Sequence, residues 1–362
     1  MNPWGDFHHA TGAGWSLYWR VPDPDAGGLE IWWADFRGRR VLWKGSQPFA
    51  IVPYHFPVGG SEPPAPDFTY KDGLGNQFGG APFTALKSGA PNADLRFQSQ
   101  WVAGDDLAAV VVTIEAATSF DPAALAISAK FRCGWYQYVH RWEFNSYGEI
   151  HPSLGMGGAL NPTAKDKAHV HHMYFRIDLD IDGFSTDVFE VFRHDGYDDN
   201  ANGDHWTTMA VQGKHLLDPN SARKFRIRDL VSTTSRSAPT RGYEIELPAL
   251  AATDNHSTAD AWAMIYRGDN VQQGSDVGPP HSSDAVLDGY ATGPLDTANG
   301  SDVVVWVVVR HHHEPRNATE EANFLPYHYE GFEIMPRGFE LFRAERRSHR
   351  QTRSRQARPA SR

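Results

Sequence analysis

The stretch DVVVWVVVRHHHEPR, residues 302–316, constrains the fold more than any other part of the chain. Its apolar residues, 303–309, follow one another without alternation. A short continuous apolar run is typical of a strand that is buried on both faces. Three histidines follow, so we expect this strand to deliver a histidine cluster at its end.

Alternating apolar and polar side chains between turn residues predict further strands. The 33 glycines and 24 prolines are spread through the chain, which suits short strands joined by turns. We therefore expect a mainly β protein with one domain over residues 1–342, and a long functional loop at 268–301. The expected strands lie within 15–55 and at 108–117, 124–131, 134–144, 169–180, 186–194, 224–230, 242–248 and 260–267.

The net charge of -10 is unevenly distributed. Residues 343–362 hold eight arginines and one glutamate, and their composition predicts a basic, disordered tail. The acidic remainder argues against nucleic acid as a partner and favours cationic ligands. No stretch is apolar enough for a membrane span, and the start lacks the pattern of a signal peptide. Together with the single cysteine, Cys133, this predicts a cytoplasmic protein.

Two of the chain's 18 histidines have the spacing of metal ligands on a strand. His169 and His171 are two residues apart, so their rings project from one face, whereas His172 points to the other. Imidazole suits copper, zinc, iron and nickel. The cluster at 311–313 can supply a third ligand, but periodicity does not choose among its members. An alternative is that the pair consists of ordinary hydrogen-bonded or surface histidines.

Several segments, in the same order from about Trp15 to Phe342, resemble the catalytic domain of copper amine oxidases. These are GRRVLWKGSQPFAIVPY, HVHHMYFRIDLDIDG, and DVVVWVVVRHHHEPR with the later LPYHYEGFEIMPRGFELF. The resemblance implies a large antiparallel β-sandwich, called a supersandwich, and a homodimer. It also implies a copper ion bound by His169, His171 and His313, because the family's third ligand stands in an H-x-P-R context.

The stretch GWYQY is similar to the family motif whose tyrosine becomes the cofactor topaquinone. The resemblance implies that Tyr136 is the modified residue. Trp135 and Gln137 replace the asparagine and the acidic residue of the family motif, which changes volume, hydrogen bonding and local charge. By the same resemblance, Asp72 is the catalytic base and Tyr54 hydrogen-bonds the quinone.

Three aspartates of this chain resemble the residues of a second, peripheral metal site of the family. Asp178 and Asp180 follow the histidine strand, and Asp302 precedes the third ligand. Alternation places Asp178 and Asp180 on the face away from His169 and His171. Carboxylate oxygens suit calcium.

The activity that the resemblance implies is oxidation of a small or peptide-borne primary amine by dioxygen, yielding an aldehyde, ammonia and hydrogen peroxide. The altered quinone motif leaves open a copper oxidase or oxygenase of the same fold that forms no quinone. A metal-binding β-sandwich without catalysis is the third interpretation.

Overall fold

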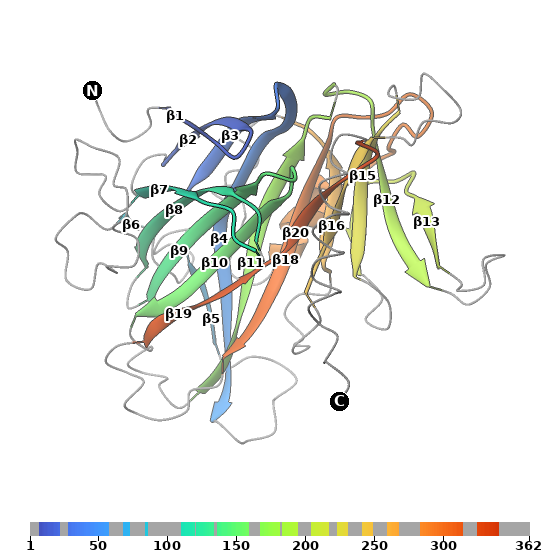
Figure 1. Cartoon of the computed structure of the whole chain (residues 1–362). Coiled ribbons are helices and arrows are strands. Elements are labelled where there is room, and N and C mark those ends of the chain that lie inside the picture. The colour runs from blue at the N-terminus through green and yellow to red at the C-terminus, as the bar shows by residue number, and fades with distance from the viewer. Residues whose placement is uncertain are drawn as a thin grey trace, which may run out of the picture.

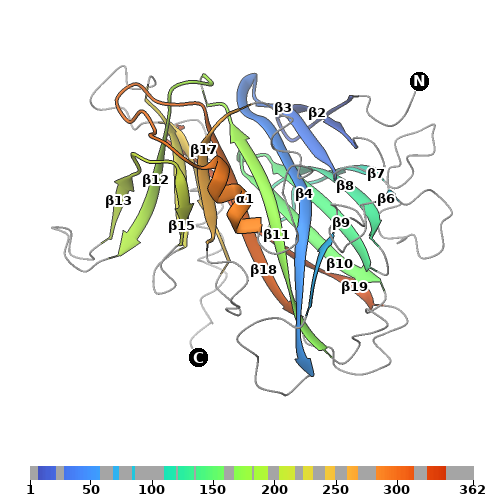
Figure 2. The same cartoon turned by 180° about the vertical axis from the view of Figure 1, so that it is seen from behind.

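The computed structural model describes the protein in separate ranges of the chain. The described residues are 7–21, 28–57, 68–72, 84–85, 110–119, 121–133, 136–158, 167–181, 183–194, 204–216, 223–230, 241–248, 259–267, 283–313 and 324–339. In these ranges the strands form two antiparallel sheets, seen from opposite sides in Figures 1 and 2. The predicted class, mainly antiparallel β, is confirmed.

The first sheet carries the strand predicted within residues 302–316, which spans Val303–His313 in the structure. Its order is β1-β2-β3-β4-β11-β18-β17-β14, and β5 also pairs with β4. Its members are β1 (His8–Gly12), β2 (Trp15–Arg20), β3 (Glu30–Phe36), β4 (Arg39–Pro57), β5 (Phe68–Asp72), β11 (Lys167–Leu179), β14 (Gly213–His215), β17 (Ala261–Ile265) and β18 (Val303–His313).

The second sheet has the order β13-β12-β15-β16-β20-β10-β9-β8-β6, with β19 paired to β10 and β7 to β8. Its members are β6 (Thr84–Ala85), β7 (Val110–Glu115), β8 (Ala124–Cys133), β9 (Tyr136–Asn145), β10 (Ile150–Gly158), β12 (Asp187–His194), β13 (Asp204–Thr208), β15 (Lys224–Asp229), β16 (Gly242–Glu246), β19 (Phe324–Gly331) and β20 (Glu333–Arg337).

Strand β18 is buried on both faces, as its unbroken apolar run predicts. One face, with Val305 and Val307, belongs to the main core between the sheets. The other face, with Trp306, belongs to a smaller core on the outside of the first sheet. The helix α1 (Ser283–Tyr290) contributes Leu287 to that smaller core and covers this outer face in Figure 2.

The helix corrects one expectation, because residues 268–301 were predicted to be a loop without regular structure. Residues 268–282 lie outside the described ranges, but 283–290 are helical. Burial of Leu287 and Ala291 against the outer core explains why this polar segment is ordered. The predicted end of the domain at residue 342 and the basic tail lie outside the described residues.

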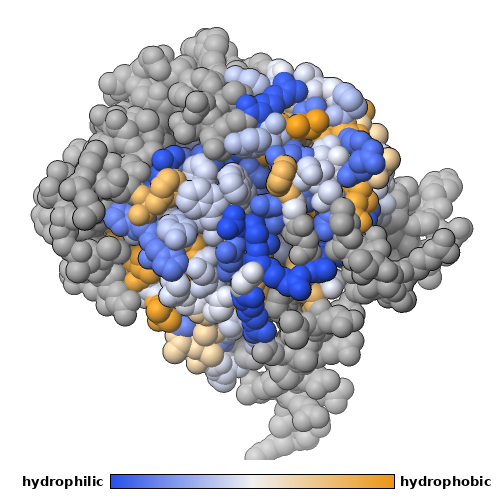
Figure 3. All heavy atoms as spheres, turned by 90° about the horizontal axis from the view of Figure 1, so that it is seen from above, coloured by the Kyte–Doolittle hydropathy of each residue, from blue (hydrophilic) through white to orange (hydrophobic). Residues whose placement is uncertain are grey.

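The surface is as expected for a protein that buries its apolar side chains. On the face seen in Figure 3, hydrophobic residues of the described part lie in separate patches among hydrophilic ones. Within the described ranges, no helix is long and apolar enough to cross a membrane.

Candidate metal centre

The pairing of β11 with β18 brings the histidines of two distant segments together. In this antiparallel register His169 lies opposite His313, and His171 lies opposite His311. Neighbouring residues that share a face of two paired strands have side chains in contact. The strand geometry therefore places His169, His171 and His313 on one face, as expected for the first two.

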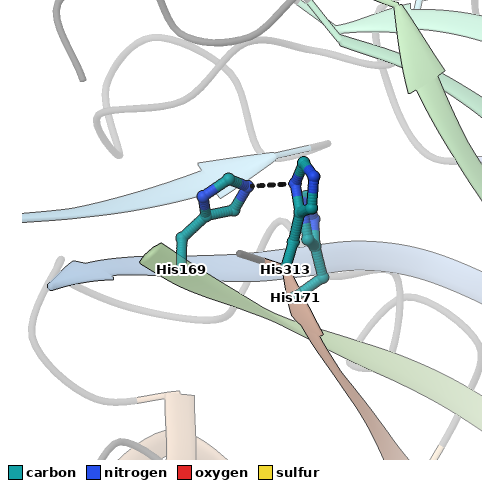
Figure 4. A group of neighbouring side chains, drawn as sticks. All are labelled: His169, His171 and His313. Atoms are coloured by element: carbon teal, nitrogen blue, oxygen red, sulfur yellow. Dashed lines mark hydrogen bonds between the residues drawn. The ribbon is translucent and has the colours of Figure 1, made fainter. Parts of the chain in front are cut away.

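The three rings converge at the ends of the strands, as Figure 4 shows. His313 Nδ1 lies 3.1 Å from His169 Nε2. The centroid of the His169 ring is 5.1 Å from that of His171 and 4.7 Å from that of His313. One ring nitrogen of each residue lies within 4.8 Å of those of the other two. No second group of this kind occurs among the described residues.

This geometry fits a transition metal. Two metal–imidazole bonds of about 2.0 Å at an angle of about 100° hold their nitrogens about 3.1 Å apart. That separation matches the one between His169 and His313. Three imidazoles without a carboxylate suit copper or zinc rather than calcium or magnesium, and they leave a coordination position for another ligand.

Burial keeps the histidines in the form that binds metal. His169 and His171 are 0% and 1% exposed. Burial, reinforced by the neighbouring histidines, lowers the pKa of His171 well below its usual value and that of His313 to about 2. Protonated imidazole has no lone pair for a metal, so the low pKa leaves the rings of His171 and His313 neutral and ready to coordinate near pH 7.

Tyr138, from β9 of the second sheet, contacts the triad. Its hydroxyl oxygen lies 3.4 Å from His171 Nδ1, and both residues are buried. A partner on one ring nitrogen fixes the orientation of a histidine and leaves the other nitrogen for the metal. The triad is therefore supported from both sheets. Tyr138 is the last residue of the GWYQY stretch, and the sequence gives no sign of this contact.

The remaining predicted active-site residues are described by their backbone alone. Tyr54 on β4 is the register partner of His169. Asp72 ends β5, where it is paired with Ala50 of β4. Tyr136 begins β9, two residues before Tyr138. Trp135 lies outside the described residues.

The structure brings together two of the three aspartates of the predicted second metal site. Asp178 and Asp302 line a pocket of about 310 Å³ together with Trp43, Phe184 and Tyr266. Burial, followed by repulsion from the other two aspartates of the predicted site, raises the pKa of Asp302 to about 7.

The other two aspartates have different surroundings. Asp178 accepts a hydrogen bond of 3.0 Å from Arg176, on the face opposite the histidines. Burial raises the pKa of Asp180 as well. Asp180 is not among the residues that line the pocket.

Asp187 is a further acidic residue that the sequence did not single out. It begins β12, is 1% exposed, and neither carboxylate oxygen has a hydrogen-bond partner in the described structure. Burial, followed by repulsion from Asp302, raises its pKa well above the usual value. An aspartate at the start of a strand is common, and its burial becomes visible only in the folded chain.

The model of the copper amine oxidase enzyme domain matches residues 112–355. This range includes Tyr136, Tyr138 and the three histidines, whereas Tyr54 and Asp72 precede it. Primary amine oxidase 2 of Arabidopsis thaliana is 24% identical over 239 residues, which cover 57% of this chain and 35% of that protein. The chain thus spans about a third of the length of this curated relative.

Solved structures show the same fold. The copper-containing benzylamine oxidase from Hansenula polymorpha aligns with a TM-score of 0.63 at 19% identity, over 91% of this chain and 60% of the other. Aspergillus nidulans amine oxidase aligns with a TM-score of 0.57 at 14% identity, over 93% of this chain and 53% of the other. With two thirds of its length matched by the family model, the chain belongs to the copper amine oxidase family.

Proposed function

We propose that this protein uses copper to oxidise a primary amine to an aldehyde, with release of ammonia and hydrogen peroxide. The observation that carries the proposal is the cluster of three imidazoles, His169, His171 and His313, in which burial lowers the pKa of His171 and His313. Membership of the copper amine oxidase family supports it. Copper with dioxygen would convert Tyr136 to topaquinone, which supplies an electron sink for oxidation of the amine.

The strand order supports the assignment of the other residues. Strands β5, β4, β11 and β18 are consecutive neighbours in the first sheet. Tyr54 is thus on β4, the strand next to the histidine strand β11, and Asp72 is on β5, the strand beyond it. Tyr136 is on the facing sheet. In the proposed reaction Asp72 accepts the proton from the carbon beside the amine nitrogen, which requires hydrogen-bond reach. Tyr54 orients the quinone ring by a hydrogen bond.

We further propose the substrates, the oligomeric state, the cellular location and a second metal ion. The substrates are dioxygen and a small or peptide-borne amine, which the acidic body of the protein attracts. We also propose a homodimer in the cytoplasm. Calcium at Asp178, Asp180 and Asp302 would offset the repulsion that raises the pKa of Asp302.

The mass of one peptide tests the cofactor. Trypsin cleaves after Arg132 and Arg141 and releases CGWYQYVHR. After copper loading in air, we expect this peptide to gain two oxygen atoms and lose two hydrogens, with fragmentation placing the change on Tyr136. Phenylhydrazine should give a coloured adduct, and Tyr136→Phe should abolish both results and the peroxide formed from amines. An unmodified peptide from fully copper-loaded protein contradicts the proposal.

Trp135 and Gln137 favour a second candidate, a copper oxidase or oxygenase of this fold without the quinone. A bulky indole and an amide replace the two residues that flank the tyrosine in the family motif. Stoichiometric copper and an unmodified Tyr136, together with consumption of dioxygen on addition of a reductant, would support this candidate. Copper binding without any oxygen consumption would support a metal-binding protein that has no catalytic activity.

A further inference from the structure

A second group of side chains of metal-ligating types lies beside the triad, although its donor atoms are more widely spaced than those of the triad. His311 comes from β18, whereas His328 and Glu330 come from β19 of the other sheet. His328 and Glu330 are two residues apart, which places both on one face of β19. That strand is held to β10 by the pairs of His328 with Met156 and of Glu330 with Leu154.

His311 contacts each of the other two side chains across the two sheets. His311 Nδ1 lies 3.1 Å from Glu330 Oε1. The rings of His311 and His328 are 5.9 Å apart between centroids and nearly parallel, at 27°. Two imidazoles on one four-coordinate metal have centroids about 5 Å apart. The observed spacing is somewhat longer, and the donor atoms of the three residues do not all lie within 4.8 Å of one another. Metal binding at this group therefore requires the exposed His328 ring to rotate toward the other two donors.

The donor set has a clear preference among metals. Two imidazoles and one carboxylate suit zinc, copper and related divalent transition metals. The exposed ring of His328 and the Glu330 carboxylate, whose side chain is 35% exposed, leave room for water as a further ligand. The triad differs, because two of its three rings are fully buried.

The two groups are close enough for their metals to interact. The ring of His311 lies 6.4 Å from that of His313, between centroids. We propose that His311, His328 and Glu330 form a second, solvent-accessible site for a divalent transition metal, so that each chain binds two such ions. This proposal requires metal at the neighbouring triad but no amine oxidation.

Metal content tests the proposal directly. The untagged protein is dialysed against copper sulfate and then against buffer, and copper per chain is measured by mass spectrometry. We expect two equivalents for the unchanged protein and one for His328→Ala or Glu330→Gln. The matched control is His9→Ala, an exposed histidine on β1, which should keep two equivalents.

Electron paramagnetic resonance gives an independent readout. Two copper(II) ions in adjacent sites broaden each other's signal, so the unchanged protein should show a broadened spectrum and His328→Ala a sharp one of a single ion. A single copper equivalent in the unchanged protein overturns the proposal. Two equivalents that persist in both His328→Ala and Glu330→Gln overturn it as well. If no quinone forms but two coppers are still bound, the proposed function is contradicted and the second metal site is not.

Discussion

Three histidines form the centre of the site, and we expect their contributions to copper binding to differ from those of the adjacent histidines. His312 lies between two residues of the histidine cluster but projects from the other face of β18. Replacing His313 removes one of three ligands from the triad. We expect His313→Ala to weaken copper binding at the triad by at least about 100-fold, on the scale of a metal ligand and its partners.

His312→Ala is the matched control for that change. It alters the same strand by the same substitution, so its triad should keep the affinity of the unchanged protein. Competition with a chelator of known affinity measures both variants. Equal weakening in the two would mean that the choice of His313 is wrong.

Tyr138 tests whether the second sheet supports the triad. Tyr138→Phe removes the hydroxyl that lies 3.4 Å from His171 and keeps the ring. We expect copper affinity, measured without oxygen, to fall about 10-fold, the lower end for partners of metal-binding histidines. Tyr174→Phe is the control, because Tyr174 is equally buried but belongs to the outer core. Unchanged affinity in Tyr138→Phe would show that the contact contributes nothing.

The sequence predicted the three histidines of the triad but little about the residues that surround them. Strand periodicity alone placed His169 and His171 on one face, and the resemblance chose His313. The contacts of Tyr138 and the burial of Asp187 could not be predicted, because each depends on how one sheet lies on the other. The roles of Tyr54, Asp72 and Tyr136 stay predictions, since their side chains lie outside the described part of the structure.

Strands were predictable where their residues repeat at the strand period or form an apolar run. The strands β8, β11, β15 and β18 follow from their sequences in this way. The strand β10, IHPSLGMGG, does not, because proline and glycines are poor strand formers. It is a strand because β9, β19 and β20 pair with it. The helix α1 depends in the same way on the apolar face that it covers.

The ends of β11 and β18 bring together the acidic residues of the predicted second site, and this makes stability depend on pH. Asp302 has a pKa of about 7 in the folded protein, against about 3.9 in an unfolded chain. The folded state therefore binds the proton more tightly, and ionised Asp302 destabilises the fold above pH 7. The destabilisation should disappear as the pH falls from about 7 to 4.

Asp302→Asn removes that ionisation. In the presence of a chelator we expect the variant to melt at a higher temperature than the unchanged protein at pH 8, with the difference shrinking below pH 7 and closing near pH 4. Calcium should raise the melting temperature of the unchanged protein at pH 8 more than that of the variant. A difference that is independent of pH would contradict the elevated pKa, and an equal effect of calcium on both would contradict a calcium site.

At the scale of the whole molecule, the site exists because two sheets pack face to face. Strand β4 packs tightly against β9 at Gly45, where an added Cβ would lie 2.4 Å from the Trp142 ring. Trp142 is 0% exposed and is four residues from Tyr138 on β9, so both residues face the core. A side chain at position 45 would push β9 away from the first sheet, which carries His171.

Gly45→Ala should therefore lower both stability and copper affinity. Overpacking of this kind costs about 1–3 kcal/mol of unfolding free energy, which urea denaturation measures. Gly213→Ala is the control, since nothing lies within 4 Å of its added Cβ. Trp142→Phe in the Gly45→Ala background should restore part of the loss, because the smaller ring leaves room for the methyl group.

If Gly45→Ala lowers stability and leaves copper affinity unchanged, the first sheet holds the triad without help from Tyr138. A joint loss that Trp142→Phe partly reverses would show that the spacing of the sheets sets the geometry of the metal centre.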